Sequence, residues 1–78
     1  MPTVLRLTGH RFFFFSNESA EPPHIHVETS EKYAKFWLSP VALARSVGYS
    51  PRELRQLHEL VQENRSLLEE KWHEHFGS

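Results

Sequence analysis

The chain has 78 residues, a formal net charge of −1 and no cysteine. This length predicts one small domain over residues 1–78, and the absence of cysteine excludes disulfides and thiolate metal sites. No apolar run approaches the roughly 18 residues of a transmembrane helix, so we expect a cytoplasmic protein that does not enter a membrane.

The first half of the chain predicts β-strands. Residues 3–7 form the first expected strand. Residues 11–16 contain four consecutive phenylalanines, a run typical of a strand that is buried on both faces or of an aromatic layer under helices. Residues 24–28 and 33–38 alternate in polarity and are separated by a short turn, which predicts a hairpin. Sequential strands with short loops usually pair, so an antiparallel meander of three or four strands is the simplest sheet.

Two signals for the start of a helix come after the strands. Ser39-Pro40 places an N-cap residue before a proline and predicts a short helix over about residues 40–46. Ser50-Pro51-Arg52-Glu53 repeats the signal as a capping box and predicts a long helix over about residues 51–75. We therefore expect an α+β fold in which the sheet is packed by one short helix and one long C-terminal helix.

The apolar residues of the long helix form one stripe with a polar gap at Asn64. If the distal half of the helix extended past the sheet, its apolar residues would need a partner, because monomers rarely expose such a patch. This reasoning predicts a homodimer. The partner-binding residues would be Leu67, Leu68, Trp72 and Phe76. The alternative is a monomer in which the helix kinks or folds back.

The segment Pro22-Pro23-His24-Ile25-His26-Val27-Glu28 is the most informative part of the chain. Side chains alternate between the two faces of a strand, so His24, His26 and Glu28 are expected on one face. Ile25 and Val27 then point to the core. Two imidazoles held side by side after a stiff diproline predict a site that is presented to solvent.

Three interpretations of this histidine pair remain open. The two rings can act as general acid and base on RNA, helped by nearby cations that contact the phosphate. Those cations would be Arg11, Lys32 and Lys35. Alternatively His24, His26 and Glu28 hold a divalent metal, the one cofactor that the sequence suggests. In the third interpretation both histidines are ordinary hydrogen-bonding residues at a sheet edge.

Several stretches resemble a known family. Arg11 to Asn17, the core Pro22 to Glu28 and the ending Trp72 to Gly77 are similar to small prokaryotic proteins that share the domain of unknown function 4160 (DUF4160). The resemblance implies membership of small two-gene modules similar to toxin–antitoxin pairs. It directs attention to His24 and His26, with Glu28 and Lys35 close by.

We therefore expect a toxin–antitoxin-type protein that acts on RNA through His24 and His26, as a metal-independent ribonuclease. Its partners would be RNA and a cognate small protein encoded nearby. Two alternatives stay open. One is a non-enzymatic regulator that binds nucleic acid or protein, such as the neutralising partner of a pair. The other is a protein that binds a divalent metal.

Overall fold

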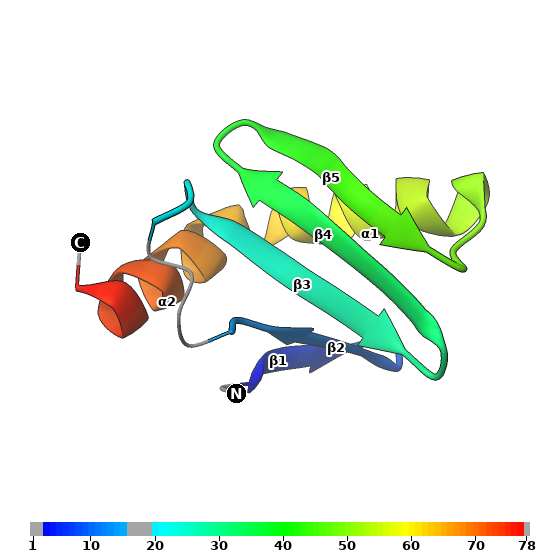
Figure 1. Cartoon of the computed structure of the whole chain (residues 1–78), viewed down its shortest axis with the longest axis horizontal. Helices are drawn as coiled ribbons and strands as arrows, with labels where there is room; N and C mark the ends of the chain where they lie inside the picture. Colours follow the sequence, from blue (N-terminus) through cyan, green and yellow to red (C-terminus); the bar gives the residue numbers. More distant parts are fainter. Residues whose placement is uncertain (1–2, 16–19, 78) are drawn as a thin grey trace.

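The computed structural model describes residues 3–15 and 20–77, which form a five-stranded sheet and two helices. The elements are β1 (Thr3–Leu7), β2 (His10–Phe13), β3 (His24–Thr29), β4 (Lys32–Leu38), β5 (Val41–Val47), α1 (Pro51–Glu63) and α2 (Arg65–Phe76). The strands pair antiparallel in chain order, as Figure 1 shows. The expected α+β class is confirmed, with more strands than the three or four predicted.

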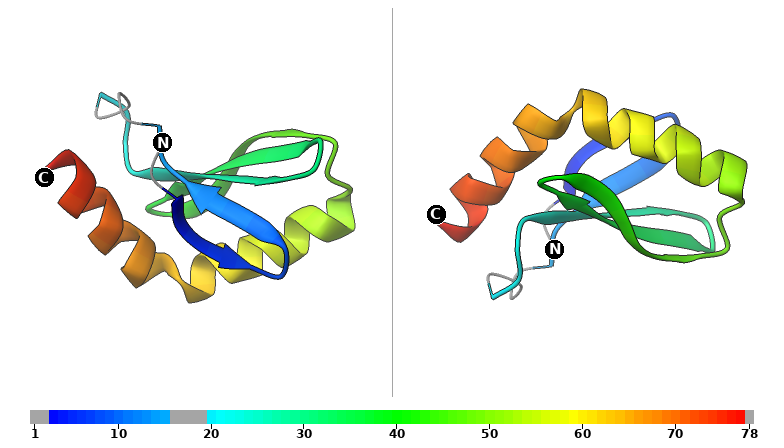
Figure 2. Two further views of the ribbon diagram at one scale, coloured as in Figure 1. Left: turned by 90° about the horizontal axis from the view of Figure 1, so that it is seen from below. Right: turned by 90° about the horizontal axis from the view of Figure 1, so that it is seen from above.

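Both helices cover the same face of the sheet, which we call the helix face (Figure 2). Among the described residues, the opposite face carries no helix, and we call it the open face. Neither α1 nor α2 is long and apolar enough to cross a membrane. This arrangement positions the site, because alternation along each strand assigns successive side chains to one face or the other.

The hydrophobic core lies on the helix face. Ile25 and Val27 of β3 are fully buried there, as the alternation predicts, together with Ala34 and Phe36 of β4. The helices contribute the buried residues Leu57, Val61, Leu68 and Trp72. Each large apolar side chain of this kind stabilises the fold by about 1.5–3 kcal/mol relative to an exposed position. The core therefore fixes which residues remain for the open face.

The predicted short helix over residues 40–46 is wrong. This segment is strand β5, which pairs with β4 from Tyr33↔Val47 to Leu38↔Val41. Ser39-Pro40 lies in the turn between the two strands and does not cap a helix. A Ser-Pro pair suits either role, and the ladder with β4 together with the packing of Val41 on the core outweighs the weak helix propensity of the segment.

The predicted long helix begins as expected and is then interrupted. The capping box of Ser50 and Glu53 is present, with proline at the first helical turn. At Asn64 the backbone leaves helical geometry, and the side chain donates a hydrogen bond to the carbonyl oxygen of Leu60 at 2.8 Å. The polar gap in the apolar stripe is therefore where α1 ends and α2 begins.

Because the helix breaks at Asn64, most of the residues expected at a dimer interface pack within the chain instead. Leu68 and Trp72 are buried within the chain, and Phe76 packs against the same core. Leu67 remains 40% exposed. The kinked helix, which was the alternative to the dimer, is the arrangement observed, and these side chains no longer require a second copy of the chain.

The boundaries of β1, β3 and β4 match the expectation closely, whereas those of β2 differ. Strands β3 and β4 extend one residue beyond the predicted ranges, and a two-residue turn at Ser30 and Glu31 joins them. Strand β2 ends at Phe13, whereas the prediction continued to residue 16, which lies outside the described residues. Thr8 and Gly9 both have positive φ, the backbone of the tight turn that links β1 to β2.

Candidate functional site

Strand register gathers aromatic and charged side chains on the open face. Cross-strand partners lie on the same face of a sheet, and Phe13, His26 and Lys35 form one such row across β2, β3 and β4. The described residues of the open face include Arg11, Phe13, His24, His26, Glu28, Tyr33, Lys35, Trp37 and Arg45. The sequence thus folds so that its histidine pair stands among rings and cations.

The two histidines lie together, as predicted, but they are not open to solvent. Their ring centroids are 5.0 Å apart, and the exposed fractions are 0% for His24 and 2% for His26. The expectation of a solvent-presented pair is therefore wrong. Alternation assigns a side chain to a face, but neighbouring side chains decide whether water reaches it, and on this face large aromatic rings surround the pair.

His26 is enclosed by aromatic rings and is hydrogen-bonded to Tyr33. The ring centroids of Phe13 and Phe15 lie 5.3 Å and 4.6 Å from that of His26. Its Nδ1 is 2.6 Å from the Tyr33 hydroxyl. Tyr33 itself is only half-buried. Of the two residues, Tyr33 is therefore the one whose side chain reaches the surface.

His24 is fixed at the start of β3. Its Nδ1 donates a hydrogen bond to the carbonyl oxygen of Pro22 at 2.8 Å, so this nitrogen carries a proton. The ring packs against two tryptophans, with centroid distances of 5.7 Å to Trp37 and 4.8 Å to Trp72. His24 therefore ties the sheet to α2 and acts as a packing residue.

Two of the three predicted phosphate-binding cations lie on the open face, each beside a carboxylate. Arg11 Nη1 is 2.6 Å from Glu28 Oε2, and the guanidinium lies 4.4 Å from the ring centroid of Phe13. Lys35 Nζ is 2.6 Å from Glu21 Oε1. The Arg11 and Lys35 side chains are 19% and 16% exposed. Both cations are therefore near the histidine pair and already have an anionic partner.

The third predicted cation lies elsewhere. Lys32 pairs with Glu53 of α1, with 2.6 Å between Nζ and Oε2, on the helix side of the sheet. The hydrogen bond from Lys32 and the capping contacts with Ser50 lower the pKa of Glu53 to about 2. Lys32 therefore stabilises the start of α1 and does not join the histidine pair. Arg45, opposite Lys35 on β5, and Arg6, opposite Arg11 on β1, are instead exposed cations of the open face.

The expected metal ligands are engaged otherwise. His24 Nδ1 contacts Pro22, His26 Nδ1 contacts Tyr33 and Glu28 contacts Arg11. Within residues 3–15 and 20–77, no three histidine or carboxylate side chains are arranged to hold a metal ion. The geometry of the donors therefore gives the metal interpretation no support.

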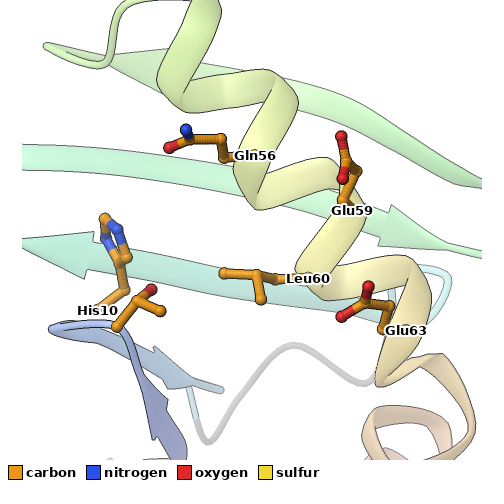
Figure 3. Close-up of a pocket in the computed structure, with 6 residues that line it drawn as sticks. His10, Gln56, Glu59, Leu60 and Glu63 are labelled. Carbon is orange, nitrogen blue, oxygen red and sulfur yellow. The ribbon is translucent and has the colours of Figure 1, made fainter.

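A hollow on the other side of the sheet, shown in Figure 3, is separate from this cluster. Its labelled lining residues are His10, Gln56, Glu59, Leu60 and Glu63. His10 alternates with Arg11 and faces the helices, so it does not join the histidine pair. Its Nδ1 lies 3.0 Å from the Tyr49 hydroxyl, and burial, with smaller contributions from Glu53 and Glu28, raises the pKa of Tyr49 to about 12.

The sequence pattern places Tyr33, Lys35 and Trp37 on one face but gives no role to Tyr33. Its contact with His26 depends on the β3–β4 register, in which Tyr33 is opposite Glu28 and Lys35 is opposite His26. The short turn between the strands is a signal for this register, because turn length fixes which residues face each other. Tyr33 and Trp37 are the two half-exposed rings of β4 on the open face.

The comparisons with known proteins give one match. A family model described as "Domain of unknown function (DUF4160)" matches residues 9–73, which cover every strand except β1, all of α1 and most of α2. No curated protein and no solved structure matches the chain. The family resemblance expected from the Pro-Pro-His-Ile-His-Val core is confirmed. The chain belongs to the DUF4160 family.

Proposed function

We propose that this protein binds single-stranded RNA on the open face of its sheet, as the RNA-acting member of a toxin–antitoxin-type pair. One observation carries the proposal: partly exposed aromatic rings and cations alternate on a sheet face that α1 does not cover and that α2 contacts at His24, through Trp72. Tyr33 and Trp37 supply the rings, and Arg11, Lys35 and Arg45 supply the charges.

The aromatic rings favour a single strand over a duplex. Unpaired bases stack on aromatic side chains that a sheet presents, and each stacked base contributes about 1–3 kcal/mol. Tyr33, Lys35 and Trp37 occupy alternate positions of β4, so each is separated from the next by about 6.6 Å along the strand. A row of ring, cation and ring fits a chain in which bases and phosphates alternate.

The charges favour an anionic ligand of moderate affinity. Arg11 and Lys35 pair with Glu28 and Glu21, and a phosphate has to compete with these carboxylates. Arg45 forms no ion pair with any residue that the structure describes, and it is exposed. Because phosphate contacts release counterions, RNA binding should weaken steeply as salt concentration rises.

The buried histidines support this face from beneath. His24 packs against the ring of Trp37, and His26 holds the Tyr33 hydroxyl through a hydrogen bond. This placement differs from direct contact with a substrate, which their burial disfavours. The alternative of a non-enzymatic regulator uses the same surface, so the two possibilities differ only in the fate of the bound RNA.

Fluorescence anisotropy with a labelled 12-nucleotide unstructured RNA tests the binding surface. We expect Arg45→Ala to weaken binding severalfold and to reduce the slope of log affinity against log salt by about one. Arg55→Ala, at another exposed arginine, on α1, is the matched control and should change neither quantity. Equal effects of the two substitutions, or a preference for duplex RNA, would contradict the proposal.

Induced expression tests the cellular role. A toxin that acts on RNA should arrest growth, and co-expression of the neighbouring gene product should relieve the arrest. Trp37→Ala, which removes one partly exposed ring, should also relieve it at equal protein level. Full growth under strong expression of the wild-type protein would favour the regulator instead.

A further inference from the structure

We propose that Tyr33 is a catalytic residue that takes the proton of an RNA 2′-hydroxyl while its own proton passes to His26. The inference rests on RNA binding at the open face and adds cleavage to it. It assigns the chemistry to a residue that was not among the candidates from the sequence, and it gives the buried imidazole a route to the substrate.

The geometry of the pair is suited to proton transfer. Tyr33 Oη and His26 Nδ1 are 2.6 Å apart, a short hydrogen bond. In the tautomer with the proton on Nε2, the tyrosine hydroxyl donates and Nδ1 accepts. His26 is 2% exposed, whereas Tyr33 is half-buried. A substrate on this face therefore reaches the Tyr33 side chain before the imidazole.

A phenol needs such a partner to act as a base. At neutral pH a phenol is protonated, so it accepts a second proton only as it gives up the first. An imidazole is the side chain best matched to take that proton near neutral pH. The hydrogen bond joins the two groups before substrate arrives, and the surrounding rings of Phe13 and Phe15 hold the imidazole in place.

Cations stand on both sides of Tyr33. Glu28, its partner across β3, holds Arg11 at 2.6 Å, and Lys35 lies two residues further along β4. A guanidinium binds a phosphate through two parallel hydrogen bonds and suits the charge that develops on phosphorus. The ammonium of Lys35 is a proton donor on the same face. The face therefore offers a base, a phosphate clamp and an acid.

The cleavage step balances without a metal or a co-reactant. The 2′-oxygen forms a bond to phosphorus, and its proton moves to the Tyr33 oxygen as the Tyr33 proton moves to His26. The bond from phosphorus to the 5′-oxygen breaks, and Lys35 gives that oxygen a proton. The products are a 2′,3′-cyclic phosphate and a 5′-hydroxyl. Lys35 then regains a proton from water, and the His26 proton returns to Tyr33 as Tyr33 releases one to the hydroxide that remains.

The experiment measures binding and cleavage of an end-labelled 20-nucleotide RNA by the full chain. Tyr33→Phe keeps the ring and removes the oxygen, so cleavage should fall at least about 100-fold, with affinity changed less than about twofold. Tyr49→Phe is the matched control, since Tyr49 also contacts a histidine through its hydroxyl but on the helix face. It should leave both binding and cleavage unchanged.

A second variant tests the role of the imidazole. The amide oxygen of His26→Asn can accept the hydrogen bond from Tyr33 but cannot take its proton. We expect kcat to fall while KM stays the same, and circular dichroism checks that the variant is folded. Cleavage should also leave a cyclic phosphate end and should stop at a 2′-deoxy substitution.

The outcomes separate this inference from the binding proposal. If the wild-type protein binds RNA and leaves it intact, the catalytic role of Tyr33 is overturned and RNA binding stands. If it neither binds nor cleaves RNA, both fall. Cleavage by Tyr33→Phe at the wild-type rate, or an equal loss of binding and cleavage in that variant, also overturns the catalytic role.

Discussion

The chain contains two tyrosine–histidine pairs, one on each face of the sheet, and they differ in what surrounds them. On the helix face, Tyr49 is buried and joins His10 at 3.0 Å beside the carboxylates of α1. On the open face, Tyr33 is half-buried and joins the buried His26 at 2.6 Å among cations. The same two residue types are thus packed beneath the helices in one place and lie at a partly exposed surface in the other.

The difference comes from the layers of the fold. Helices α1 and α2 pack on the helix face and bury its hydrophobic core, with a hollow left open beside His10 (Figure 2). The buried side chains of this face contribute mainly to stability. In the described part of the chain no helix lies over the open face, and its rings pack on each other and, at His24, on Trp72 of α2. A small protein that leaves aromatic surface half-exposed gives up burial that would stabilise it. A ligand that covers the rings restores that burial.

Neighbouring residues of β4 give the largest expected contrast in stability. Phe36 points to the core and Trp37 to the open face. Phe36→Ala should lower the free energy of unfolding by about 3–5 kcal/mol, because it leaves a cavity in the core. Trp37→Ala should cost clearly less, since its ring is only half-buried. Urea unfolding measures both, and equal losses would contradict the distinction between the faces.

When RNA affinity is measured instead of stability, a substitution on the open face should have the larger effect. Trp37→Ala should weaken binding by about 1–3 kcal/mol, or roughly 5- to 150-fold, if one base stacks on the indole. Leu67→Ala, which alters an exposed apolar side chain of α2, serves as the control and should leave the affinity unchanged. Anisotropy titrations at fixed salt provide the comparison, and unaltered binding by Trp37→Ala would place RNA elsewhere.

Carboxylates on the open face should act against RNA. Glu21→Gln frees Lys35 from its partner and removes a negative charge, so affinity should rise about two- to fivefold, as expected for an exposed ion pair. Glu53→Gln breaks an equally short pair with Lys32 near α1 and should leave RNA affinity as it is. A drop in affinity for Glu21→Gln would mean that Glu21 organises the surface.

The smallest expected effect is the pH dependence of the stability that the Lys32–Glu53 ion pair contributes. The hydrogen bond from Lys32 lowers the pKa of Glu53 from 4.5 to about 2, so folding favours its charged form. The resulting stability is present above pH 4.5 and is lost as the pH falls toward 2. Acid titrations of stability should show this loss in the wild type and not in Glu53→Gln. Lys32→Met should remove most of it as well.

Much of the fold can be predicted from local signals in the sequence. Alternation places His24 and His26 on one face, and the Ser50–Glu53 capping box starts α1 at the predicted residue. Strand β5 could not be predicted, because Ser39-Pro40 suits a turn as well as a helix start. The break at Asn64 was visible only as a polar gap, and tertiary packing decides that the helix bends there.

The candidate site was predicted less completely than the fold. Sequence alternation gives the face of a side chain but not what covers it, so the burial of His26 by Phe15 and other rings was missed. Lys32 was expected near the pair because it is close in sequence. It sits at the first position of β4, where alternation turns it toward Glu53 instead.

The indole N–H signals of the two tryptophans test most directly whether RNA binds to the open face. Trp37 lies on that face, and Trp72 of α2 is buried in the core. In a two-dimensional NMR titration with an unstructured RNA, the Trp37 signal should move and the Trp72 signal should stay, with Trp37→Phe used for assignment. Movement of the Trp72 signal alone, or of neither signal at saturating RNA, would contradict the account.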